Sequence, residues 1–158
     1  MTSQTDDFEQ TIADPLLLAL YRYWRRKAGD RRMPRRDEMD PIEMKPWLSN
    51  LALIEFMGSV ETYWVKLEGT NIEAFYGNRR TGRGIEALTS ESERELMMAQ
   101  YCPVVEQGIP AFHEAEFENS HGQLSPHIKL ILPLSDDGVA MNMVIAGIYF
   151  KSPERLGR

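Results

Sequence analysis

The sequence predicts an α+β fold: a five-stranded antiparallel sheet with helices packed on one face and a further helix flanking it at the N-terminus. Two observations lead to this expectation. The strand-like segments are grouped, two before the longest helical segment and three after it, whereas a parallel sheet requires strands and helices to alternate. In addition, Asp136-Asp137-Gly138 lies between the last two strand-like segments and is a strong signal for an antiparallel hairpin.

The composition fits one globular domain. The chain has 158 residues, of which 42% are hydrophobic and 27% are charged, so it has the size and apolar content for a single core. No apolar run approaches the roughly 20 residues that a membrane-spanning helix needs. We expect a flexible tail over residues 1–12, one domain over 13–150 and a C-terminal tail over 151–158.

The ends and the single cysteine bear on location. The N-terminal sequence MTSQTDDFEQ is acidic and polar, which is not the pattern of a secretory signal. Cys102 is the only cysteine, so no internal disulfide can form, as is typical of a reducing compartment. Both observations predict a cytoplasmic protein.

The first helix is predicted over residues 15–28. Asp14 is a good N-cap, Pro15 fits the first helical position, and Gly29 is a typical stop. This helix carries one apolar stripe, which must cover either the sheet of the same chain or a second copy of the protein. We expect the stripe to contribute to a homodimer. The stripe consists of Leu17, Leu20, Tyr21 and Trp24.

Two short segments follow this helix. Asp40-Pro41-Ile42-Glu43 has a proline at the first helical position and an acidic capping pattern, so it predicts a second short helix that Pro46 ends. The largely apolar run from Leu51 to Met57 is bounded by Asn50 and Gly58 and predicts a buried first strand.

The next stretch, residues 63–84, predicts a strand, a short helix and a polar loop. Alternation predicts that Tyr63, Val65 and Leu67 face the core. Gly69 ends this strand, and Thr70 is expected to cap a short helix with Glu73 as its partner. Gly77 is expected to end that helix, as a glycine in the left-handed conformation does.

The second half of the chain predicts one longer helix and three strands. The helix begins near Glu91, and Pro103 is expected to interrupt or kink it before Gly108. The three strands are expected over residues 111–118, 127–134 and 139–150.

Several turn and cap motifs resemble those of PAS domains, in particular the bacterial PAS-like domains that make up nearly a whole small protein. This resemblance implies a non-catalytic sensory or protein-interaction module in bacterial signalling that acts through a partner protein. It transfers no catalytic or cofactor residue, and neither a flavin-linking cysteine motif nor a haem-ligand motif is recognisable, so any cofactor stays unknown. The motifs are Tyr23-Trp24, Met33-Pro34-Arg35, Asp40-Pro41, Gly69-Thr70, Gly77, Thr81-Gly82-Arg83 and residues 133–138.

A sensor of this kind requires a small apolar pocket between sheet and helices, with a few polar groups that orient a ligand. We expect its lining to come from the apolar residues of the strands and of the helices that follow them. The candidates are Tyr63, Val65, Phe75, Tyr76, Leu96, Leu130, Leu132, Met143 and Ile145.

A basic segment suggests an alternative function. Residues 21–36 contain eight basic side chains and one acidic one, in a chain whose formal net charge is −6. Such a segment is either a solvated surface or a site for a nucleotide, a nucleic acid or another polyanion, which arginines bind through paired hydrogen bonds. The candidate binding residues are Arg22, Arg26, Arg31, Arg32, Arg35 and Arg36.

The histidines give little support to a metal site or an enzyme. His113 and His127 fall on neighbouring predicted strands and could approach each other, but Glu114 would face the opposite side from His113. We therefore predict solvent-facing histidines and no metal site. An enzyme of unknown type remains a third alternative, for which Cys102 or a serine would need one of these histidines as a base. No nucleophile elbow, phosphate-binding loop or dinucleotide fingerprint occurs, so no catalytic residue is assigned.

Overall fold

The structure, a computed structural model, describes residues 4–88, 90–118 and 121–151. Short 3₁₀ turns also occur within the connections, among them Arg36–Glu38 and Leu48–Asn50. The main elements in chain order are α1 (Gln4–Thr11), α2 (Pro15–Ala28), β1 (Leu51–Glu55), β2 (Trp64–Glu68), α3 (Thr70–Tyr76), α4 (Glu91–Gln107), β3 (Ala111–Glu118), β4 (Leu124–Ser135) and β5 (Met141–Phe150).

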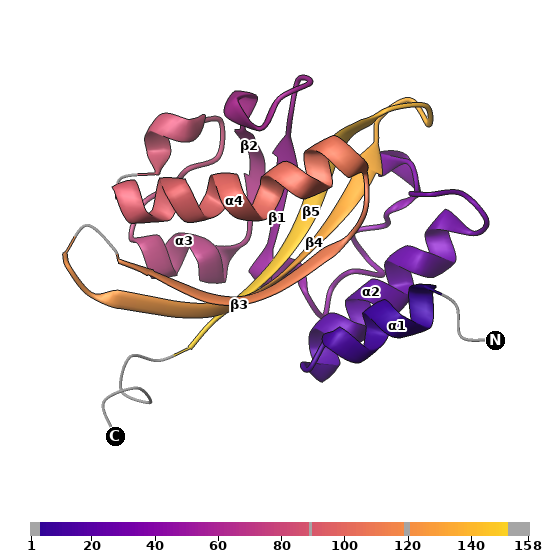
Figure 1. Cartoon of the computed structure of the whole chain (residues 1–158), viewed down its shortest axis with the longest axis horizontal. Coiled ribbons are helices and arrows are strands. Elements are labelled where there is room, and N and C mark those ends of the chain that lie inside the picture. The colour runs from indigo at the N-terminus through magenta and orange to yellow at the C-terminus, as the bar shows by residue number, and fades with distance from the viewer. Residues whose placement is uncertain (1–3, 89, 119–120, 152–158) are drawn as a thin grey trace.

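The five strands form one antiparallel sheet in the order β2-β1-β5-β4-β3 (Figure 1). The sequence-based fold class is therefore confirmed. The last strand, β5, lies at the centre of the sheet between β1 and β4. Gly138, at φ 83°, lies in the turn between β4 and β5, where the side chain of Asp137 accepts hydrogen bonds from the N–H groups of Val139 and Ala140.

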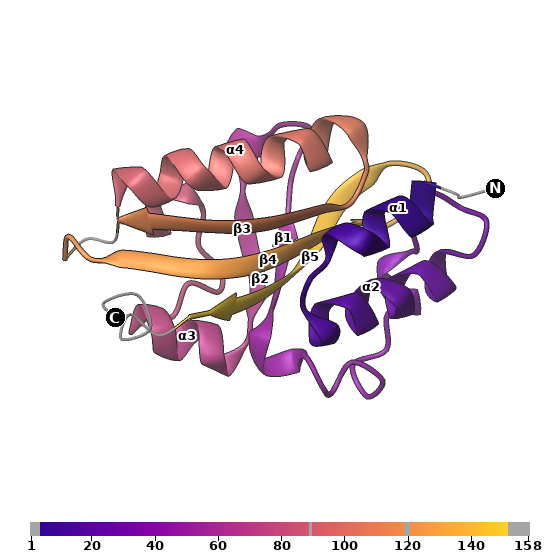
Figure 2. The same ribbon diagram turned by 60° about the horizontal axis from the view of Figure 1, so that its bottom comes forward.

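Helices cover both faces of the sheet (Figures 1 and 2). We call the face under α3 and α4 the inner face and the face under α1 and α2 the outer face. Alternate strand residues supply the two cores: Ile131 on β4 packs into the inner core, while its neighbours Leu130 and Leu132 pack into the outer core. The expected flanking helix therefore covers the side of the sheet that α3 and α4 leave uncovered.

Helix α2 forms at the predicted residues for the predicted reasons. The carboxylate of Asp14 accepts a hydrogen bond from the N–H of Leu17 at 3.0 Å, and Gly29 follows the helix at φ 61°. The helix lies very close to β5, because a Cβ at Gly147 would come within 2.8 Å of Leu17. The buried indole of Trp24 donates a hydrogen bond to the carbonyl of Pro133 at 2.9 Å, which ties α2 to β4.

The predicted tail and the predicted second helix both differ from the structure. Residues 4–11 form α1 rather than a flexible tail, since the ring of Phe8 lies 5.0 Å from that of Tyr21 and Ile12 is buried. The helix expected from Asp40 does not form. The Asp40 carboxylate accepts a hydrogen bond from the N–H of Ile42, as a cap would. Residues 41–47 nevertheless form turns only.

The predicted alternation of β2 fails after Val65. Leu53 pairs with Leu67 and Ile54 pairs with Val65, so Lys66 is an extra residue, a β-bulge. The bulge leaves Leu67 57% exposed and turns Glu68 into the inner core. Leu67 was predicted to face the core, and this prediction is wrong, because pairing with β1 overrides the local pattern.

The helix caps were predicted in part. Gly69, not Thr70, is the N-cap of α3, and no side chain caps it. Gly77 ends α3 at φ 72°, as predicted. Helix α4 begins after Ser90, whose hydroxyl accepts from the N–H of Glu93, and it continues through Pro103 to Gln107 rather than stopping there.

Candidate functional site

Beneath α4 the inner core contains a group of buried polar side chains, which we call the polar core. Most cores are apolar, because each buried charge or polar group must find a partner inside the protein. These residues come from β2, the loop after α3, α4 and β4, and each is at most 9% exposed. The polar core consists of Glu68, Arg80, Glu93, Gln100, Tyr101, His127 and Lys129.

Arg80 lies at the centre of a buried ion triad. One of its terminal nitrogens is 3.1 Å from Glu68 Oε2 and the other is 3.1 Å from Glu93 Oε2. The guanidinium also stacks over the ring of Tyr76, 3.6 Å from its centroid. Burial raises the pKa of Glu68, although the charge of Arg80 and its hydrogen bond favour the ionised carboxylate. The triad thus joins β2, the 77–84 loop and α4.

Lys129 is buried and has no carboxylate partner among the described residues. Its Nζ donates to Gln100 Oε1 at 2.8 Å and to Met97 Sδ at 3.1 Å, and it lies 5.1 Å from the centroid of the Tyr101 ring. Burial lowers the pKa of Lys129 to about 7, with Glu93 opposing the shift. Near neutral pH this side chain is therefore divided between its charged and neutral forms.

The two strand histidines face the inner side of the sheet and not the solvent. His127 is 2% exposed, and its Nδ1 lies 3.2 Å from the carbonyl oxygen of Ser125, so Nδ1 carries the proton. Burial lowers the pKa of His127 to about 4 and also lowers that of His113. Both rings are neutral at pH 7, and the Nε2 atom of His127 then acts as an acceptor.

Several buried polar atoms of this region lack hydrogen-bond partners among the described residues. Each such atom costs about 1–3 kcal/mol and calls for an explanation, such as a bound molecule or water. The amide nitrogen of Gln100 is a donor, and the hydroxyl of Tyr101 can both donate and accept. The remaining atoms are acceptors. The atoms are Glu68 Oε1, Gln100 Nε2, Tyr101 OH, His113 Nε2 and His127 Nε2.

The predicted pocket residues do not line one pocket. Tyr63, Val65 and Tyr76 belong to the inner core, and Leu96 is half-buried on α4. Phe75 is 36% exposed and stacks on Phe150, with 3.6 Å between ring centroids. The other four pack on the outer face, because strand alternation separates them from the polar core. These four are Leu130, Leu132, Met143 and Ile145.

The four residues predicted for a dimer helix are buried within the chain itself. Leu17 and Leu20 are fully buried in the outer core, where α2 covers β4 and β5. Tyr21 and Trp24 are stacked at 5.8 Å between ring centroids and are 3% and 1% exposed. The stripe therefore covers the chain's own sheet, and a dimer would need another surface.

The arginines of the basic segment are mostly engaged in local contacts. Arg22 pairs with Glu9 at 3.4 Å, Arg31 with Glu38 at 2.7 Å and Arg35 with Asp37 at 3.3 Å. Arg26 lies over the ring of Tyr23, and Arg32 donates to the carbonyl of Gln107. Arg22 and Arg26 nevertheless line one open surface hollow, together with Arg25.

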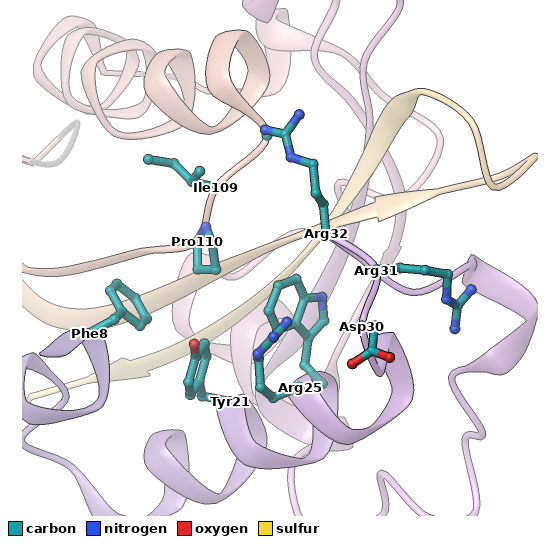
Figure 3. A pocket seen from close by; sticks show the side chains of 10 residues that line it. Phe8, Tyr21, Arg25, Asp30, Arg31, Arg32, Ile109 and Pro110 are labelled. Carbon is teal, nitrogen blue, oxygen red and sulfur yellow. The ribbon is translucent and has the colours of Figure 1, made fainter. Parts of the chain in front are cut away.

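A surface pocket of about 510 Å³ does occur beside this segment (Figure 3). It lies between α1, α2 and the connection from α4 to β3, and it combines aromatic and arginine side chains. Figure 3 shows Arg31 and Arg32 pointing away from each other, so the guanidinium groups do not converge on one point. The lining residues include Phe8, Tyr21, Trp24, Arg25, Asp30, Arg31, Arg32, Ile109 and Pro110.

Two further observations limit the chemistry of the described residues. They contain no group of three or more histidine, cysteine, aspartate or glutamate side chains placed to hold a metal ion. None of their helices is both long and apolar enough to cross a membrane.

The polar core was missed at the sequence level. One signal was present: Lys129 interrupts the apolar run from Ile128 to Leu134, and a lysine inside a buried strand calls for a special role. Arg80 gave no signal, because it stands among other arginines in a polar loop. Glu68 was hidden by the β-bulge, which no local pattern reveals.

Comparison with known proteins agrees with the architecture. The sequence profile of a family described as "PAS domain" matches residues 13–149. No curated protein sequence matches the chain significantly.

Solved structures with a similar fold have low sequence identity. A light–oxygen–voltage domain studied with a flavin analogue is 12% identical, with 73% of this chain and 87% of that chain covered and a TM-score of 0.54. The PAS domain of BvgS from Bordetella pertussis is 15% identical, with 75% and 93% covered and a TM-score of 0.51. A PAS domain from Colwellia psychrerythraea is 12% identical, with 70% and 96% covered and a TM-score of 0.50. At these identities the likeness shows the fold alone.

Proposed function

Because the chain belongs to the PAS domain family, we propose that it is a non-catalytic sensory module of bacterial signalling that responds to a small polar ligand through a partner protein. We place this module in the cytoplasm. The observation that carries the proposal is the set of unpartnered buried atoms next to Lys129. A polar ligand that enters the polar core would satisfy atoms that otherwise destabilise the fold.

The chemistry of the polar core limits the kind of ligand. Gln100 Nε2 and Lys129 Nζ donate hydrogen bonds, whereas His127 Nε2 and Glu68 Oε1 accept them. A fitting ligand therefore carries both donors and acceptors, as a hydroxy acid or an amide does. A purely apolar molecule would leave the same atoms without partners.

Helix α4 connects the polar core to the surface. Glu93, Met97, Gln100 and Tyr101 lie along its buried side, so a ligand that repositions these side chains also shifts α4. The opposite side of α4 is exposed at Glu95 and Ala99. We propose that a partner protein reads the position of this helix.

Native mass spectrometry of freshly purified protein tests the proposal. We expect a stoichiometric small molecule to be retained and to be lost or weakened at least tenfold in Gln100→Leu, which removes a donor and an acceptor from the polar core. Glu95→Gln, on the exposed side of the same helix, is the matched control and should retain the ligand. If the native protein carries no molecule and binds none from a library of polar metabolites, the polar core holds water and the ligand-sensing proposal is wrong.

A second candidate function is nucleotide binding at the basic segment. The pocket in Figure 3 favours it, because Arg25 lies there beside Tyr21 and Asp30, and its side chain forms no hydrogen bond or ion pair with another described residue. Arginine binds phosphate through paired hydrogen bonds, and the half-buried ring of Phe8 could stack on a base.

Titration with ATP at increasing salt tests this second candidate. A real site would give affinity that falls steeply with salt and at least fivefold in Arg25→Gln. Arg79→Gln, at an exposed arginine elsewhere in the chain, is the control. Equal binding by both variants would mean that only the overall charge attracts the nucleotide.

We also propose that the protein is a homodimer. Because the apolar stripe of α2 is used within the chain, the contact would form elsewhere, for example around the exposed side chains of α4. Sedimentation at several concentrations measures the association, and a monomer at all of them would contradict it.

A further inference from the structure

A second cavity lies on the outer face of the sheet, on the side opposite the polar core. Its volume is about 530 Å³, within the range of pockets that bind small molecules. It lies between the 36–48 segment and strands β1, β2, β4 and β5. Its walls are buried and apolar: Met39, Met44, Leu51, Leu53, Leu134 and Ile145.

The rim of this outer cavity exposes two large apolar side chains. Leu48 is 39% exposed and Leu67 is 57% exposed, and both belong to the lining. Leu67 is at the rim because of the β-bulge at Lys66, which keeps it on the outer side of an edge strand. Two methionine side chains in the wall can adjust to an occupant of variable shape.

The rim also carries one positive charge without a partner. Arg36 is exposed, lines the cavity and bonds to no side chain of another described residue. The neighbouring Asp37 also lines the cavity, but its carboxylate is paired with Arg35 at 3.3 Å. The charge left over at the mouth is therefore that of Arg36.

We propose that the outer cavity binds a medium-chain fatty acid, with the alkyl chain against the apolar wall and the carboxylate at the guanidinium of Arg36. Each methylene that is buried tightens binding about fourfold, so an alkyl chain supplies most of the affinity. The arginine supplies the selectivity, because it favours a carboxylate over an alcohol and repels an amine. This site shares only Glu68 with the polar core and does not depend on the function proposed for that core.

Such a ligand would lie against the strand that also carries part of the polar core. Leu67 lines the outer cavity, and the next residue, Glu68, pairs with Arg80 on the inner face. Leu67 on the outer face and Glu68 on the inner face are therefore consecutive residues of the same strand. Occupation of the outer cavity is expected to alter the environment of the ion triad.

Calorimetric titration of the intact chain with decanoate, below its micelle concentration, tests the proposal. We expect one molecule to bind per chain, with decylamine at least tenfold weaker. Arg36→Gln should weaken decanoate about tenfold through loss of a charge-assisted hydrogen bond. Leu48→Glu places a negative charge at the exposed rim and should weaken it by a similar factor without disturbing the core.

Two control variants separate this site from the others. Arg26→Gln removes another exposed arginine, which lies outside the cavity, and Gln100→Leu alters the polar core. Both variants should leave the affinity for decanoate unchanged. The proposal is overturned if the wild-type protein binds no decanoate, or if Arg36→Gln and Leu48→Glu bind it as well as the wild type. It is also overturned if decanoate dissociates a dimer in sedimentation, because a second copy would then be the occupant of the cavity.

Discussion

At the scale of single residues, the burial of Lys129 makes stability depend on pH. A charged amine without a carboxylate partner is costly in the interior, and the lowered pKa expresses that cost. Other ionisable groups around it are Arg80, Glu93, His113 and His127. Its neighbours therefore both favour and oppose its charge, and burial decides the outcome.

The pH dependence of stability should reveal Lys129. Below pH 7 this side chain is protonated in both folded and unfolded states, so the full cost of burying the charge is present. Between pH 7 and about 10 only the unfolded state binds the proton, so the free energy of unfolding rises with pH. Comparing urea unfolding at pH 7 and pH 9, we expect the wild type to gain about 2 kcal/mol relative to Lys129→Met.

The exposed Lys66→Met is the control for this comparison and should follow the wild type. His127, whose pKa is about 4, contributes a separate rise in stability at lower pH, between about 4 and 6.5. If the free energies of unfolding of the wild type and Lys129→Met change in parallel above pH 7, the pKa of Lys129 is not lowered in the folded state.

Arg80 provides a second prediction at this scale. Removing it would leave Glu68 and Glu93 buried without a counter-charge. We expect Arg80→Met to lower the free energy of unfolding by about 3–5 kcal/mol at pH 7, as measured by chemical denaturation. The exposed neighbour Arg79→Met should change it by less than about 0.5 kcal/mol. A loss below 1 kcal/mol for Arg80→Met would contradict the buried ion triad.

At the scale of elements, α4 contains an avoidable cost. Pro103 lacks the N–H that would bond to the carbonyl of Ala99, yet the helix continues past it. Because Pro103 is exposed, Pro103→Ala should restore that bond and raise the free energy of unfolding by about 2 kcal/mol. Thermal and urea unfolding measure this gain, and Glu95→Ala on the same helix should give less than 0.5 kcal/mol. A destabilised Pro103→Ala would mean that the proline is required by the local backbone.

The elements also show what the sequence could and could not predict. The caps of α2 were readable because Asp14, Pro15 and Gly29 act through contacts a few residues apart. The β-bulge at Lys66 could not be predicted, since it depends on pairing with β1. For the same reason the inward position of Glu68 could not be predicted. The short helix expected at Asp40 does not form, although its local cap does. Here the packing of Met44 and Trp47 in the outer core favours turns over a helix.

At the scale of the whole molecule, the sheet has two cores that depend on different parts of the chain. The outer core is closed by α2, and Trp24 is its largest fully buried side chain. We expect Trp24→Ala to lower the free energy of unfolding by about 3–5 kcal/mol, measured by chemical denaturation. Trp64→Ala, at a side chain that is 43% exposed on the edge strand, is the matched control and should cost less than about 1 kcal/mol. Similar losses for the two variants would contradict the role of α2 as a cover.

The lowered pKa of Lys129 has a consequence for binding that calorimetry can detect. At pH 7 about half of the molecules carry the proton on Nζ, given a pKa of about 7. A ligand that places an oxygen acceptor beside Nζ would raise this pKa, and the complex would then draw a fraction of a proton from the buffer. The observed binding enthalpy should therefore change with the ionisation enthalpy of the buffer, and the slope gives the number of protons taken up per ligand.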